Sequence, residues 1–131
     1  MKQPLSEIRT RAAAASPLWA AALLPGEPPQ PRFSGRCPER YLLGVEMIHE
    51  AYLLHYGTSR LFSQNDRDLA LLTGDWLYAA GLAEICTTGD LAAVDALADL
   101  IARCAANRGG AEPVPDDPLW DATVAGLGAA T

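Results

Sequence analysis

The chain has 131 residues, which is enough for one domain and too few for a multidomain enzyme. Half of the residues are hydrophobic, which suffices for a core, and about two dozen are alanine, the best helix former. Alternating runs of β-branched residues are absent, which excludes an all-β domain. The formal net charge is −6 and the ten Lys and Arg residues are scattered. This distribution excludes the basic stripe of a nucleic-acid-binding protein and disfavours an anionic membrane surface.

Residues 4–24 are predicted to form two short helices with a break near Ser16. Ser16 is a favourable N-cap, and Pro17 suits the first position of the second helix. Residues 12–24 are largely apolar, but Pro17 interrupts them and Glu7 precedes them. They therefore predict helix and not an export signal or a membrane span.

Residues 25–38 contain five prolines and two glycines, which predicts a connector without regular structure. Residues 39–56 follow as a helix that is apolar almost all round, the pattern of a buried helix. A polar stripe along one side of this helix, with its apolar and aromatic extension, consists of Glu46, His49, Glu50, Leu53 and Tyr56.

Residues 57–65 are predicted to be a loop, and residues 66–86 form the next helix, again apolar over a wide arc. This helix contains Gly74 and Gly81. Because a glycine inside a helix costs about 1 kcal/mol relative to alanine, we expect these positions to allow another helix to approach closely.

Residues 90–107 have apolar side chains at three- and four-residue spacing, which predicts an amphipathic helix. Residues 108–131 are rich in Gly, Pro and Ala and predict a mobile C-terminal tail, with at most a short helical turn near Trp120. Asp116 and Asp117 lie between prolines there and are expected to be solvated.

These elements predict an all-α protein, a compact helical bundle, with a helical domain at residues 1–107 and the tail at residues 108–131. The three cysteines, Cys37, Cys86 and Cys104, are odd in number, widely spaced and without a C-x-x-C pair. They predict reduced thiols in a cytoplasmic protein and neither a disulfide framework nor a zinc site.

Three partial metal motifs overlap in the helix at residues 39–56. Glu46-x-x-His49 has the spacing of a di-iron helix, but no second helix of this kind follows. His49-Glu50 begins like the zinc motif H-E-x-x-H, but Leu53 stands where the second histidine belongs. His49 and His55 are six residues apart, about 120° around a helix, so they do not share a metal. The sequence therefore predicts no metal site of its own.

Two strings, at residues 46–55 (EMIHEAYLLH) and 71–80 (LLTGDWLYAA), resemble successive helical motifs of trans-polyprenyl diphosphate synthases. With their connector they cover roughly residues 40–90. The resemblance implies the N-terminal half of the all-α isoprenoid synthase fold.

The chain departs from that family where the chemistry is expected. Residues 56–60 read Tyr-Gly-Thr-Ser-Arg in place of the family's D-D-x-x-D, so Tyr56, Gly57 and Arg60 stand where aspartates would hold magnesium. Only Arg67 lies near the position of the family's R-R-G motif, and the second aspartate-rich motif would lie beyond residue 131. The resemblance thus implies no catalysis and no cofactor in this chain, with magnesium in a catalytic partner.

By this resemblance the chain is similar to the small, non-catalytic subunit of heteromeric bacterial prenyl diphosphate synthases. It would bind a full-length synthase as a heterodimer or heterotetramer, shape product length, and contact the isoprenoid chain in a shared cavity. Asp75 is expected to pair with Arg60, Arg67 or the partner. The candidates for cavity or interface positions are Glu46, His49, Leu53, Tyr56, Leu72, Gly74, Asp75, Trp76, Ala79, Ala80 and Gly81.

Two other functions remain open from the sequence. The first is a stand-alone helical interaction or lipid-binding protein, in which Glu46, His49 and Tyr56 would be satisfied within a homodimer. The second is an enzyme of unrelated mechanism that uses His49 with Glu46 or Glu50 as an acid–base pair.

Overall fold

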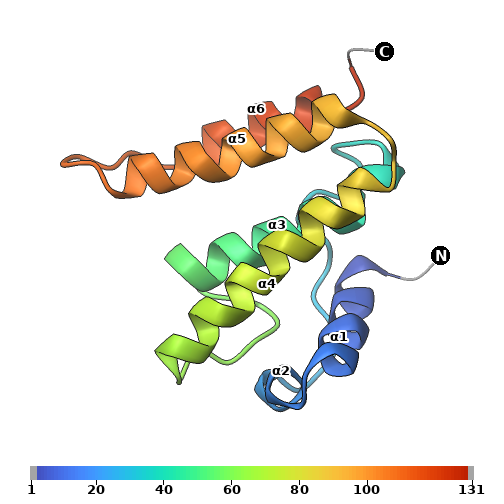
Figure 1. Ribbon diagram of the computed structural model, residues 1–131, viewed down its shortest axis with the longest axis vertical. Coiled ribbons are helices and arrows are strands. Elements are labelled where there is room, and N and C mark those ends of the chain that lie inside the picture. Colours follow the sequence, from blue (N-terminus) through green and yellow to red (C-terminus); the bar gives the residue numbers. More distant parts are fainter. Residues whose placement is uncertain (1–2, 130–131) are drawn as a thin grey trace.

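The computed structural model describes residues 3–129, and this part of the chain is all-α, as predicted. Helices α3 and α4 run antiparallel through the middle of the molecule (Figure 1). The pair α1–α2 lies at one end, and the pair α5–α6 lies at the other (Figure 1). The six helices are α1 (Pro4–Ala15), α2 (Pro17–Ala22), α3 (Glu39–Tyr56), α4 (Arg67–Cys86), α5 (Leu91–Arg108) and α6 (Asp117–Gly126).

Helix boundaries follow from local capping chemistry. The Ser16 side chain accepts a hydrogen bond from the backbone N–H of Leu18, which confirms the predicted break between α1 and α2. Asp66 and Asp90 cap α4 and α5 in the same way. Residues 25–38 contain no helix, so the predicted connector is also confirmed.

The central contact is the close approach of α3 and α4, and glycines make it possible. A Cβ atom on Gly81 would lie 2.7 Å from Ile48 Cγ1 and 3.0 Å from the carbonyl oxygen of Gly44. A Cβ atom on Gly74 would lie 2.7 Å from His55 Cδ2. Gly74 and Gly81 therefore allow the close helix approach expected from the sequence, and that approach is to α3 of the same chain.

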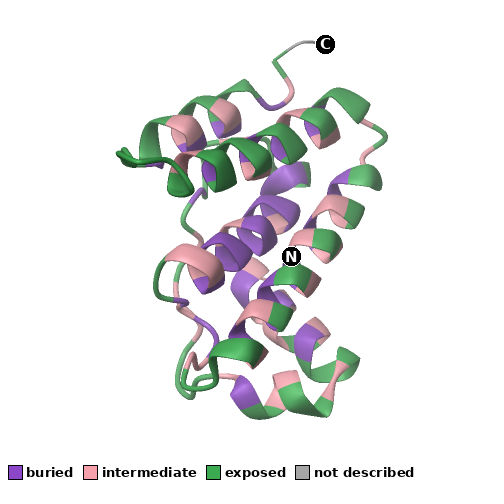
Figure 2. Ribbon diagram, turned by 60° about the vertical axis from the view of Figure 1, so that its left-hand side comes forward, coloured by how far each residue is buried: buried purple, intermediate pink, exposed green. Residues whose placement is uncertain are grey.

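Two apolar clusters pack on opposite sides of α3, which is the most buried helix (Figure 2). The first, between α3, α5 and α6, includes Tyr41, Val45, Ile48, Tyr52, Leu97, Leu100, Cys104, Trp120 and Val124. The second, between α1, α3 and α4, includes Leu5, Ile8, Met47, Ala51, Leu54, Phe62 and Leu77. Helix α3 thus joins both halves of the core.

The C-terminal region differs from the predicted mobile tail. Asp117–Gly126 form helix α6, and Trp120 and Val124 of this helix are buried in the first cluster. The Trp120 ring stacks on Phe33, with centroids 5.6 Å apart. Glycine, proline and alanine dominate the composition of this region and conceal the spacing of its few large apolar residues, and burial of those residues stabilises a short helix.

Asp116 is likewise buried, although it was expected to be solvated. Its carboxylate accepts hydrogen bonds from Tyr52 Oη at 2.6 Å, Asn107 Nδ2 at 2.6 Å and Arg108 Nε at 2.9 Å. Since these donors come from α3 and α5, Asp116 fixes the start of α6 against both helices. Burial raises the pKa of Asp116, but these hydrogen bonds and the charge of Arg108 outweigh it and hold the pKa below the usual value.

We predict that Gly81→Ala destabilises the protein by about 1 to 2 kcal/mol in urea unfolding. The methyl group would overlap Ile48 and the Gly44 backbone, and this overpacking exceeds the gain in helix propensity. Gly126→Ala in α6 is the control, because no atom lies within 4 Å of its added Cβ. Equal stability of the two variants would contradict the close contact.

We also predict that Asp116→Ala lowers the free energy of unfolding by about 2 to 3 kcal/mol, because the buried hydroxyl of Tyr52 loses its acceptor. The neighbouring exposed residue supplies a matched control, and Asp117→Ala is expected to change stability by less than about 0.5 kcal/mol. A similar loss in both variants would show that Asp116 has no special role in holding α6.

Candidate functional site

The candidate site is built around two carboxylates on one side of α3. Glu46 and Glu50 are one turn apart, and both side chains are completely buried. A buried carboxylate is stable only where hydrogen bonds and opposite charge replace its lost hydration. The hydrogen-bond and ion-pair partners of Glu46 and Glu50 therefore decide whether either carboxylate is free to bind a ligand.

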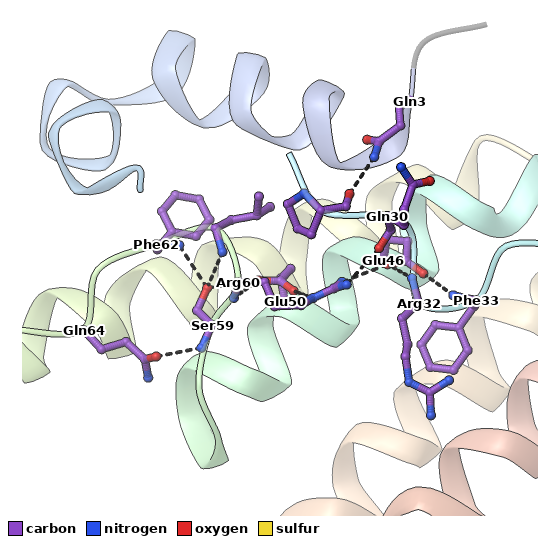
Figure 3. A network of polar contacts seen from close by, with 12 residues as sticks. Gln3, Gln30, Arg32, Phe33, Glu46, Glu50, Ser59, Arg60, Phe62 and Gln64 are labelled. Carbon is purple, nitrogen blue, oxygen red and sulfur yellow. Dashed lines mark hydrogen bonds and ion pairs between the residues drawn. The ribbon is translucent and has the colours of Figure 1, made fainter. Parts of the chain in front are cut away.

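Arg60, in the loop between α3 and α4, supplies the opposite charge for both (Figure 3). Its Nε lies 3.0 Å from Glu50 Oε2, and its Nη2 lies 3.3 Å from Glu46 Oε1. Its Nη1 donates to the carbonyl oxygen of Gln30 at 2.9 Å. One guanidinium thus bridges two turns of α3 and the connector.

Backbone groups fill most of the remaining acceptor positions of Glu46. The N–H groups of Arg32 and Phe33 donate to its two carboxylate oxygens at 2.9 and 2.8 Å. Burial still raises the pKa of Glu46, although these N–H groups and Arg60 oppose the shift. Glu46 is therefore a fixed anchor for residues 25–38, satisfied inside a single chain.

Glu50 is held from the other side by the loop that follows α3. Ser59 Oγ donates to Glu50 Oε1 at 3.0 Å, and the backbone N–H of Arg60 donates to the same oxygen at 3.1 Å. Ser59 Oγ in turn accepts from the N–H groups of Leu61 and Phe62 (Figure 3). The loop conformation thus depends on the Glu50 carboxylate.

The sequence analysis compared residues 56–60 with an aspartate-rich motif, and in the structure these positions hold structural groups. Tyr56 packs beside the first apolar cluster, Gly57 ends α3, and Arg60 pairs with two carboxylates. Within residues 3–129, no three His, Cys, Asp or Glu side chains lie close enough together to hold a metal ion.

His49 lies away from this charge network, in an aromatic environment. Its ring is 4.9 Å from Trp120 and 5.2 Å from Phe33, in each case edge to face. Burial, reinforced by the charges of Arg60 and Arg32, lowers the pKa of His49 to about 4, so the ring is neutral at pH 7. Its Nδ1 is buried and has no hydrogen-bond partner among residues 3–129, and no hydrogen bond joins His49 to Glu46 or Glu50 in this part of the chain.

The remaining candidate residues do not converge on one place. Gly74 and Gly81 face α3, and Leu53 packs beside the first cluster. Asp75 Oδ1 lies 3.0 Å from His55 Nε2, so its neighbour is His55 and neither Arg60 nor Arg67.

Other candidates from α4 lie toward its outer side. Trp76 packs against Trp19 of α2, with ring centroids 4.5 Å apart, and Ala80 packs beside the second cluster. Leu72 and Ala79 are exposed. The predicted set is therefore dispersed over the charge network, the first apolar cluster with its aromatic side chains, the α3–α4 contact, the contact of α4 with α2, and the exposed side of α4.

The sequence singled out Glu46 as a candidate site residue, but it did not reveal that Arg60 is the cation paired with it. The sequence places Glu50 on the polar stripe, but it offers Arg60 as a substituted motif position and as a partner of Asp75, not as the partner of the two glutamates. A signal was available, because two carboxylates at i, i+4 in an apolar helix require a nearby cation. Arg60 is the first basic residue after that helix, four residues beyond its end.

Comparison with protein-family models, with curated proteins and with solved structures finds no match to this chain.

We predict that Arg60→Ala lowers the free energy of unfolding at pH 7 by about 3 kcal/mol or more, because two buried carboxylates lose their counter-charge. Arg60→Lys is expected to lose less, since it keeps the charge without the bridging geometry. Arg67→Ala, an exposed arginine nearby, is the control. Urea unfolding of the three variants measures the difference, and a neutral Arg60→Ala would contradict the proposed charge bridge.

The loss of unfolding free energy caused by Arg60→Ala, relative to the unsubstituted protein, is also expected to shrink as the pH falls from 7 toward about 4.5. Arg60 lowers the pKa of Glu46, so its removal raises that pKa further above the value in the unfolded chain. A carboxyl with a raised folded-state pKa contributes more stability as the pH falls, because the folded state takes up the proton first. If the loss of unfolding free energy stays constant or grows over this pH range, the Glu46 carboxylate is not the source of the instability of Arg60→Ala.

Proposed function

We propose that the chain is a non-catalytic accessory subunit that binds a full-length prenyl diphosphate synthase and helps to set product chain length. The observation that supports this most directly is the Arg60 bridge. Arg60, which by the resemblance stands at the last aspartate of the metal-binding motif, is committed to holding the fold through its ion pairs with Glu46 and Glu50. Magnesium and the ionisation of the diphosphate would belong to the partner.

The outer face of α4 supports binding to another protein. Leu72, Asp75, Ala79, Ala83 and Cys86 are exposed and recur at three- to four-residue spacing, and Asp75 is the one charged residue of these five. The helix is also apolar enough to meet the length and composition criteria for a membrane span, at a mean hydropathy of 1.2 with only 33% of that window buried. A helix in a protein core meets the same criteria. Helix α4 would become such a helix once a partner protein covers its exposed side.

Product-length control would require a cavity shared with the synthase. One surface hollow, between the start of α5 and the end of α6, has a volume of about 140 Å³, and a second, between α2 and the start of α4, has a volume of about 210 Å³. Both are smaller than the roughly 300 to 1,000 Å³ of typical small-molecule sites. In the proposed complex an isoprenoid chain would therefore be bounded by both subunits, with α4 contributing part of the wall.

Co-expression with the polyprenyl diphosphate synthase of the same organism tests this function. We expect a stable complex on affinity purification and a shifted distribution of product lengths. Leu72→Glu should weaken the complex at least about tenfold, because it places a charge in a desolvated contact. The matched control is Leu91→Glu on α5, which alters an even more exposed leucine outside α4. The proposed function fails if no complex forms and the product lengths do not change.

A further inference from the structure

A hollow lies where α2 meets the beginning of α4, at the end of the molecule opposite α5 and α6 (Figure 1). It has a volume of about 210 Å³ and opens at the surface. Its apolar lining consists of Leu18, Ala21, Ala22 and Leu69. A space of this size accommodates one or two apolar side chains but not a typical small-molecule ligand.

The apolar surface beside the hollow is unusually exposed. Leu18 is 65% exposed, and Leu72, one turn along α4 from Leu69, is 61% exposed. Exposed leucines beside a concavity indicate a protein contact, since isolated apolar residues on a convex surface need no such explanation. The surface therefore combines a hollow with an apolar border.

The polar side of the hollow accepts hydrogen bonds and carries negative charge. Ser63, Asn65 and Asp66 line it, and exposed Asp68 lies just beyond the lining. Exposed Arg67 stands between the two aspartates, so this segment carries a net charge of −1. The chain as a whole has a net charge of −6. A second copy would bring the same carboxylates into apposition across a twofold contact, which disfavours self-association through this surface.

We infer that this hollow binds a protein segment in which a leucine-sized apolar side chain is flanked by Lys or Arg. The apolar side chain fills the space between Leu18, Ala21 and Leu69, and the basic residues lie against Asp66 and Asp68. This docking surface borders the proposed synthase interface at Leu72, but its test is separate, because it uses a basic amphipathic peptide without any synthase and variants at Leu18 and Ala21 on α2.

The test is an amide-shift NMR titration of the ¹⁵N-labelled chain with a capped helical peptide of leucine and lysine. We expect shifts at residues 18–22 and 63–69 that weaken as salt is added. A leucine–glutamate peptide of the same pattern should not bind. Shifts confined to α5, which also carries exposed Asp95 and Asp99, would overturn the inference, as would the absence of binding.

Two variants separate the hollow from general hydrophobicity. Ala21→Phe fills the hollow while adding apolar surface, and it is expected to weaken peptide binding about tenfold or more. Leu18→Ser should also weaken binding, while Leu91→Ser, at the 78% exposed leucine of α5, should not. Unchanged binding by Ala21→Phe would overturn the inference. Concentration-dependent shifts without peptide, abolished by Ala21→Phe, would identify a second copy as the occupant and overturn it too.

Discussion

The fold depends on the burial of two negative charges in its central helix. Glu46 and Glu50 lie on α3 with no solvent contact, and neither is tolerable there without compensation. Arg60 and the backbone N–H groups of two irregular segments provide it. The connector at residues 25–38 also anchors through buried Phe33, and the loop after α3 through buried Leu61 and Phe62. The carboxylates and these apolar side chains together specify where both segments lie.

The pairing of Glu46 and Glu50 with Arg60 also limits the chemistry that these carboxylates can perform. The same residues that order the loop remove the free carboxylates that a diphosphate-bound metal needs. Arg60 supplies from within the chain the positive charge that these two buried carboxylates require. The proposal of a binding role starts from this commitment of Arg60 to the fold.

Most of the fold was predictable because helix signals are local. Proline, N-cap residues and apolar periodicity place α1 to α5 to within one or two residues. Helix α6 was missed because its stability comes from Trp120 and Asp116 contacting residues far away in the sequence. The partners of Glu46 and Asp75 were missed for the same reason, since spacing along one helix does not reveal which loop returns to it.

The position of α3 between two apolar clusters has a consequence for the protein's internal motions. The α1–α2 pair and the α5–α6 pair contact separate sides of α3 and share no cluster with one another. Each pair is therefore able to open as its own cooperative unit while α3 and α4 stay paired. Amide protons at the centre of α3 should exchange with solvent last, only after the whole chain unfolds, whereas the two end units exchange earlier and independently.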